Sequence, residues 1–120
     1  MTTPLNGPLT PTKLCVMIVW DQDADRLMQR LVENGFPATR IGSTGGFLRR
    51  GNSTILSGVT EDEVDHVIAL VREECHARKD FVPVQTLPFL GDGGFSAEPV
   101  EVRVGGAIVF VLDVERFERS

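Results

Sequence analysis

The sequence is poor in cysteine, in long apolar runs and in positive charge. Its only two cysteines, Cys15 and Cys75, form neither a CxxC pair nor a zinc-ligand spacing, so we expect no disulfide scaffold and no structural metal. No apolar run approaches the roughly 18 residues of a membrane-spanning helix. The formal net charge of -5 also argues against a nucleic-acid interface, which needs a dense basic face. These absences predict a cytoplasmic protein that contacts neither membrane nor nucleic acid.

The length of the chain fits one folded domain. Its 120 residues, 42% of them hydrophobic, suffice for one core but not for two. The segment MTTPLNGPLTPT has three prolines, no basic start and no apolar stretch, so it reads as a tail rather than a signal peptide. We therefore expect a disordered tail over residues 1–12 and the folded domain over residues 13–120.

The first half of the domain shows a strand, a helix and two further strands. LCVMIVW, residues 14–20, is apolar throughout and predicts a strand covered on both faces. The segment DQDADRLMQRLVENG predicts a helix that its aspartates cap and Gly35 ends. FPATRIGST and NSTILSGV predict two strands joined by a glycine-rich loop.

The second half begins with a stronger helix signal. Thr60 and Glu63 have the spacing of a capping box, and the helix that they begin runs to about His76. Residues 79–98 mix proline, glycine and phenylalanine without a period, so we expect a long loop of functional importance. PVEVRV and AIVFVLDV flank Gly105–Gly106 and predict either a hairpin or one long bent strand.

The predicted order, strand-helix-strand-strand-helix-strand, is that of the ferredoxin-like α+β fold, in which two helices cover one face of an antiparallel sheet. In the first and last predicted strands, however, both sets of alternating residues are apolar. Two helices leave one of these faces uncovered. The second face therefore needs a partner, and identical subunits are the usual source of one.

Three segments are similar to those of a known family: VWDQDADRL, FPATRIGSTGGFLRRGNSTILSGV and VEVRVGGAIVFVLDVERF. They resemble the PII-like cyclic-di-AMP receptor family, which is related to the nitrogen regulatory PII proteins, and TGGFL-x-x-GN is the most specific part. The resemblance spans nearly all of residues 14–117. It implies a homotrimer of ferredoxin-like protomers whose sheets face inward, with one nucleotide in each cleft between neighbouring subunits.

The glycine-rich loop at residues 42–52 carries most of the candidate site. Composition alone favours a plain turn, yet consecutive backbone amides beside glycines can also form a concavity for a phosphate. The loop is neither a P-loop nor a GxGxxG motif. The amides of this concavity belong to Thr44, Gly45, Gly46, Phe47 and Leu48. The positions that match the ligand contacts of the family are Thr39, Phe47, Leu48, Asn52, Gly58 and Phe110.

Two departures from the family pattern leave the ligand open. Gly35 and Pro37 stand where the family commonly has asparagine and arginine, and Arg119 stands where it often has glutamine. Each lost contact to the base costs ~1 to 3 kcal/mol, and Arg40 and Arg119 are candidates to compensate. The alternatives are a PII-like trimer that binds another adenine nucleotide or adenine-containing ligand, and a structural interaction module without nucleotide.

Catalytic chemistry has little support in the sequence. His66 and His76 fit solvated positions on a helix, and the aspartates Asp21, Asp23 and Asp25 fit capping better than a magnesium cluster. We therefore expect no enzymatic activity, no cofactor and no metal. The expected function is that of a cyclic-di-AMP receptor, which relays binding to an unidentified protein target through mobile loops.

Overall fold

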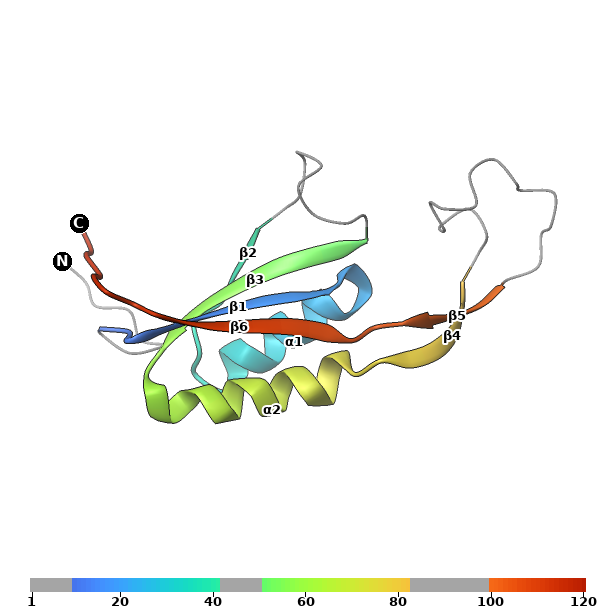
Figure 1. Cartoon of the computed structure of the whole chain (residues 1–120), viewed down its shortest axis with the longest axis horizontal. Helices are drawn as coiled ribbons and strands as arrows, with labels where there is room; N and C mark the ends of the chain where they lie inside the picture. Colours follow the sequence, from blue (N-terminus) through green and yellow to red (C-terminus); the bar gives the residue numbers. More distant parts are fainter. Residues whose placement is uncertain (1–9, 42–50, 83–99) are drawn as a thin grey trace.

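The computed structural model describes residues 10–41, 51–82 and 100–120, and Figure 1 shows how their helices and strands are arranged. In chain order the elements are β1 (Lys13–Trp20), α1 (Asp21–Glu33), β2 (Thr39–Ile41), β3 (Asn52–Val59), the 3-10 helix η1 (Glu61–Glu63), α2 (Val64–Cys75), β4 (Arg78–Val82), β5 (Val100–Val104) and β6 (Ala107–Asp113). β2, β3, β1 and β6 form, in this order, an antiparallel sheet, and β4 pairs with β5 separately. Both helices lie on one face of the larger sheet (Figure 1). The predicted α+β fold is confirmed, and the arrangement is consistent with the ferredoxin-like fold.

Helix α1 follows β1 without an intervening loop. Its apolar stripe packs into the core as predicted, through Ala24, Leu27, Met28 and Leu31. The predicted capping by aspartates is wrong, because the N-cap residue is Trp20 and no side chain caps the helix. The three aspartates have other partners: Asp21 accepts a hydrogen bond from Ser53, Asp23 is buried in an ion pair, and Asp25 lies at the surface.

The start of α2 is fixed by the capping box that its sequence predicts. The backbone N–H of Thr60 donates to Oε1 of Glu63 at 2.9 Å, and η1 forms the first turn. The helix ends at Cys75 with His76 as its C-cap, which confirms the predicted end. Its fully buried side chains are Val67, Leu70, Val71 and Cys75.

The core lies between the two helices and one face of the sheet. From β1 it takes Cys15, Met17 and Val19, and from β3 it takes Ile55 and Val59, all of them at most 1% exposed. These residues alternate along their strands, so their neighbours in sequence point to the other face. We call the face away from the helices the open face.

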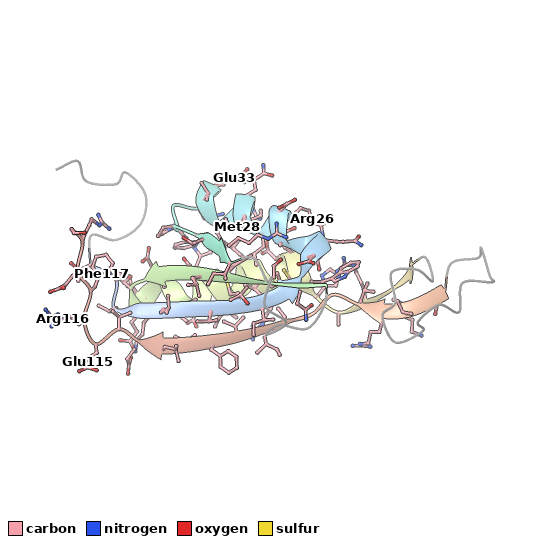
Figure 2. All side chains as sticks on the ribbon, turned by 90° about the horizontal axis from the view of Figure 1, so that it is seen from above. Arg26, Met28, Glu33, Glu115, Arg116 and Phe117 are labelled. Atoms are coloured by element: carbon pink, nitrogen blue, oxygen red, sulfur yellow. The ribbon has the colours of Figure 1, made fainter. Side chains whose placement is uncertain are left out.

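The open face is apolar, and no described segment covers its rows on β6. Strand register places Val16 of β1 opposite both Leu56 and Phe110, and the neighbouring rows contain Ile18 with Ile108 and Leu14 with Leu112. On β6 the side chains of Ile108, Phe110 and Leu112 are 56%, 52% and 48% exposed. In Figure 2, side chains of β6 extend into solvent on the side away from α1. The sequence prediction of a sheet with two apolar faces is therefore confirmed.

Strands β4 and β5 form a two-stranded arm beyond the main sheet, at the end of the molecule away from the C-terminal residues Glu115, Arg116 and Phe117 (Figures 1 and 2). Because β5 pairs with β4 whereas β6 pairs with β1, the predicted hairpin between β5 and β6 is wrong; β5 and β6 are two strands of different sheets, and the chain bends between them. The bend lies at Gly105 and Gly106, with φ of 79° and 82°. The predicted loop over residues 79–98 is wrong at its start, where residues 79–82 belong to β4, and residues 83–99 lie outside the described residues.

The predicted tail, residues 1–12, lies outside the described residues as far as residue 9. Of the remainder, Pro11 is buried, and the N–H of Thr12 donates to the carbonyl of Val59 at 3.0 Å. The carbonyl of Thr12 accepts the N–H of Val114 at 3.0 Å. Among the residues that the structure describes, no helix is long and apolar enough to cross a membrane.

Candidate ligand-binding site

Four of the predicted ligand residues are described, and all four lie on the open face. Thr39 pairs with Leu56, and Phe110 belongs to the same row across the sheet through Val16. Asn52 and Gly58 alternate with the core residues of β3 and therefore share the face of Leu56. The other predicted residues, Thr44, Gly45, Gly46, Phe47 and Leu48, lie outside the described residues.

One protomer does not bring these four residues together. Thr39 is on β2 and Phe110 is on β6, which are the two edge strands of the sheet. Three steps between strands separate them, or about 14 Å at the usual strand spacing. Phe110 is 52% exposed at its edge, and Thr39 is exposed at the other. A nucleobase seated beside Thr39 therefore does not reach Phe110 of the same protomer.

Asn52 is placed by the start of α1. It pairs with Trp20, the last residue of β1, and is half-buried. Just before it, the carbonyl of Gly51 accepts the N–H of Asp21 at 2.7 Å. Gly51 has φ of 84°, which glycine adopts without strain. The end of the glycine-rich loop is thus held against the first residue of α1, and this contact fixes where β3 begins.

Gly58 has a packing role within the protomer. A Cβ atom at this position would lie 3.1 Å from Cβ of Pro11 and 3.3 Å from its Cγ. Pro11 is buried, so it could move only if the segment that precedes β1 moved as well. Close packing against Pro11 is therefore a sufficient reason for glycine here, in addition to the ligand contact that the sequence predicts.

Arg40, a candidate to replace the missing arginine of the family, points away from the open face. It pairs with Ile55 and so faces the helices. Its Nη1 donates to Asp25 at 2.8 Å, and its Nε and Nη2 donate to the hydroxyl of Ser53 at 3.1 and 2.9 Å. The other candidate, Arg119, stacks over Phe117 at 5.4 Å from the ring centroid. Within the protomer Arg40 is engaged by these partners and does not replace the lost side chain.

A buried ion pair that sequence reasoning missed lies next to Asn52. The carboxylate of Asp23 is fully buried and accepts two bonds from Arg78, Nη2 to Oδ1 at 2.8 Å and Nη1 to Oδ2 at 3.2 Å. Arg26 donates a third bond at 2.9 Å. The guanidinium of Arg78 also lies 5.4 Å from the ring of Trp20 and donates to the carbonyl of His76. We call Trp20, Asp23, Arg26 and Arg78 the Asp23 cluster.

A cavity lies on the other face of the sheet, in the described part of the protomer. It holds about 440 Å³ between α2 and β6 and contains none of the predicted ligand residues. Its lining includes Val71, Cys75 and Val109. Burial, with a smaller contribution from the charge of Asp23, raises the pKa of the Cys75 thiol to about 12. This thiol is therefore protonated at neutral pH and is a poor nucleophile.

The two histidines show no arrangement for catalysis among the described residues. The ring of His66 packs edge-on against Phe36, with 5.0 Å between centroids, and His76 uses its backbone carbonyl to accept from Arg78. Within residues 10–41, 51–82 and 100–120, no group of three or more His, Cys, Asp or Glu is placed to hold a metal ion.

Two comparisons with known proteins extend over nearly the whole chain. The family model for the cyclic-di-AMP receptor matches residues 12–120. The crystal structure of a functionally unknown protein from Pediococcus pentosaceus ATCC 25745 is similar, with a TM-score of 0.68 and 36% sequence identity. The match covers 92% of this chain and 98% of that chain, so the two proteins share the fold as a whole.

Proposed function

This chain belongs to the cyclic-di-AMP receptor family, and from that membership we propose that it is a PII-like signal transduction protein. Cyclic-di-AMP binds in clefts between subunits of a homotrimer, and binding is relayed to a protein target. The protein has no enzymatic activity of its own and works in the cytoplasm, where the free, buried thiols of Cys15 and Cys75 stay reduced.

The observation that carries the proposal is the placement of Thr39 and Phe110 at opposite edges of one sheet. Each protomer offers half of a site at its β2 edge and half at its β6 edge. A neighbouring subunit that brings its β6 edge to the β2 edge of the first completes the site, with Asn52 at its end. The family ligand has two adenines, and such a shared cleft offers one contact surface from each subunit.

The open face supports the oligomer. Ile108, Phe110 and Leu112 are about half exposed in the protomer, and each buried Å² of apolar surface contributes roughly 25 cal/mol. Sheets turned inward around a common axis cover these side chains without using the helices. Three subunits are the number that the family resemblance implies.

A second candidate ligand is another adenine nucleotide or adenine-containing molecule. Gly35 takes φ of 82° just after α1, and Pro37 uses its carbonyl to accept the hydroxyl of Ser57 at 2.6 Å. Neither residue has a side chain that reads a base edge, and Arg40 is turned toward the helices. The side chains with which the family pattern reads the base are therefore absent from these positions, which permits this alternative.

Calorimetric titration with cyclic-di-AMP, cyclic-di-GMP, ATP and AMP tests the proposal. We expect one cyclic-di-AMP per subunit in the wild type and about 5- to 150-fold weaker binding in Asn52→Ala, since one lost hydrogen bond in a closed site costs ~1 to 3 kcal/mol. Asn34→Ala is the matched control, because Asn34 is exposed after α1 and its side-chain amide donates to the carbonyl of Arg30, away from the open face of β3. Heat with ATP or AMP alone would favour the second candidate, and no heat with any nucleotide would refute both.

A further inference from the structure

The root of the β4–β5 arm meets the candidate site through the Asp23 cluster. Arg78 is the first residue of β4, Asp23 lies in the first turn of α1, and Trp20 ends β1. The guanidinium of Arg78 therefore contacts, at one point, the helix start, the strand end and the carbonyl of His76 that closes α2. Arg26, on α1, approaches Asp23 from the solvent side, with 58% of its side chain exposed.

The contact between Arg78 and Asp23 has the properties of a fixed joint. Both carboxylate oxygens accept from the guanidinium, and this two-bond geometry restricts direction as well as distance. The carboxylate has no exposed surface, so water does not compete for it. Gly105, the residue that follows β5, packs closely against the same contact, because a Cβ atom there would lie 2.6 Å from Nη1 of Arg78.

Only one residue separates this joint from the candidate site. Trp20 contacts Arg78 through its ring and pairs through its backbone with Asn52. The N–H of Asp21, the first residue of α1, donates to the carbonyl of Gly51 at 2.7 Å. A shift at the start of β3 therefore displaces Trp20. Because Arg78 lies over the ring of Trp20 and is itself the first residue of β4, the arm moves with it.

We propose that Asp23 and Arg78 are positioning residues that couple ligand binding at Asn52 to the orientation of the β4–β5 arm. The inference rests on the proposed function and adds to it the route by which binding leaves the site. A ligand that holds Asn52 restricts Trp20, and Arg78 then restricts the arm. By reciprocity, an arm that is held in place raises the affinity for the ligand.

Hydrogen exchange of the backbone amides in β4 and β5, measured with and without cyclic-di-AMP on the full chain, tests this coupling. The test variant is Asp23→Ala/Arg78→Met, which removes both charges together and so leaves no buried charge unpaired. The matched control is Arg26→Met, which removes the third bond to Asp23 and the ion pair of Arg26 with Glu74 on α2, two interactions whose partners lie outside β4 and β5. Arg78→Lys keeps the charge and loses the two-bond geometry, and it decides the test if the double variant does not fold.

In the wild type and in Arg26→Met, we expect the ligand to slow exchange in β4 and β5 by about fivefold or more. In the double variant the ligand still releases heat, but exchange in the arm does not slow and the Kd rises about fivefold or more. For Arg78→Lys we expect a slowing of exchange and a Kd between those of the wild type and those of the double variant. Equal slowing in the wild type and the folded test variants overturns the inference alone, as does a wild type that binds ligand without slowing in the arm. A wild type that binds no nucleotide overturns the proposed function and the inference with it.

Discussion

Replacing Gly105 by alanine tests how tightly the arm root is packed. A Cβ atom there would lie 2.6 Å from Nη1 of Arg78 and 2.7 Å from the carbonyl oxygen of His76. Gly106→Ala and Gly35→Ala are matched controls, because all three glycines have φ between 79° and 82°. At Gly106 the new Cβ would make an ordinary contact of 3.7 Å with Ala77, and at Gly35 it would meet nothing within 4 Å.

All three variants share one loss of stability, because each places alanine in a left-handed backbone conformation. This costs ~1 to 2 kcal/mol and is partly offset by the lower entropy of the unfolded chain. Gly105→Ala adds a second loss. The carbonyl of His76 is the C-cap of α2 and moves little, so Arg78 is pushed from Asp23. Taking one partner from a buried ion pair costs ~3 to 5 kcal/mol, although Arg26 still contacts the carboxylate.

We therefore expect the controls to lose ~1 kcal/mol of unfolding free energy and Gly105→Ala to lose ~4 kcal/mol. With an m-value of about 1.5 kcal/mol/M in urea, the midpoint falls by nearly ~3 M for Gly105→Ala and by less than ~1 M for the controls. The three variants are compared at one protomer concentration, because association contributes to stability. A Gly105→Ala protein as stable as Gly106→Ala would refute the tight joint between Arg78 and the β5–β6 bend.

Three further outcomes are expected. Leu27 has no exposed surface, so Leu27→Ala should lower the unfolding free energy by ~2 to 5 kcal/mol. Val32 on the same helix is 46% exposed, so Val32→Ala should change that free energy by less than ~1 kcal/mol, and equal urea midpoints of the two variants would contradict this difference. Burial raises the pKa of Cys75 from 9.0 to about 12, so the thiol loses its proton at a lower pH in the unfolded chain than in the folded one, and the stability that the buried thiol contributes below pH 9 is lost as the pH rises toward 12. A thiol reagent at pH 8 should therefore modify Cys75 only after unfolding, and rapid modification of the folded protein would contradict this burial. Phe110→Ser should leave the circular dichroism unchanged and lower the mass found by light scattering, and an unchanged mass would show that the open face is not the interface.

The helices could be predicted because their signals are local. The stripe of α1 repeats within the helix, and the capping box of α2 spans only Thr60 to Glu63. The aspartates of α1 show where local reasoning ends. Asp21, Asp23 and Asp25 are alike in sequence, yet their partners are Ser53, Arg78 with Arg26, and Arg40. Most of these partners come from distant elements, so only the folded arrangement separates a buried carboxylate from two exposed ones.

For the strands and the site, too, only the features with a local signal could be predicted from the sequence. Period-two alternation correctly gives Asn52 and Gly58 a common face, because both belong to one strand. The separation of Thr39 from Phe110 depends on the order of strands in the sheet, which no local pattern contains. β4 was missed for a similar reason. Its five residues, RKDFV, do not alternate between apolar and polar side chains, and they pair with β5, which follows only after residues 83–99.

The position of β6 bears on the solubility of a single protomer. β6 is the last strand of the chain and an edge of the sheet, and its sequence AIVFVLD carries no charge before Asp113. Uncharged apolar strands at an open edge are templates for pairing with other chains and for aggregation. Asp113 and Glu115 are the only acidic residues close to the end of this run, in the place of gatekeepers. In the assembly that we propose, a second subunit covers β6, so association would protect the chain from precipitation as well as complete a cleft.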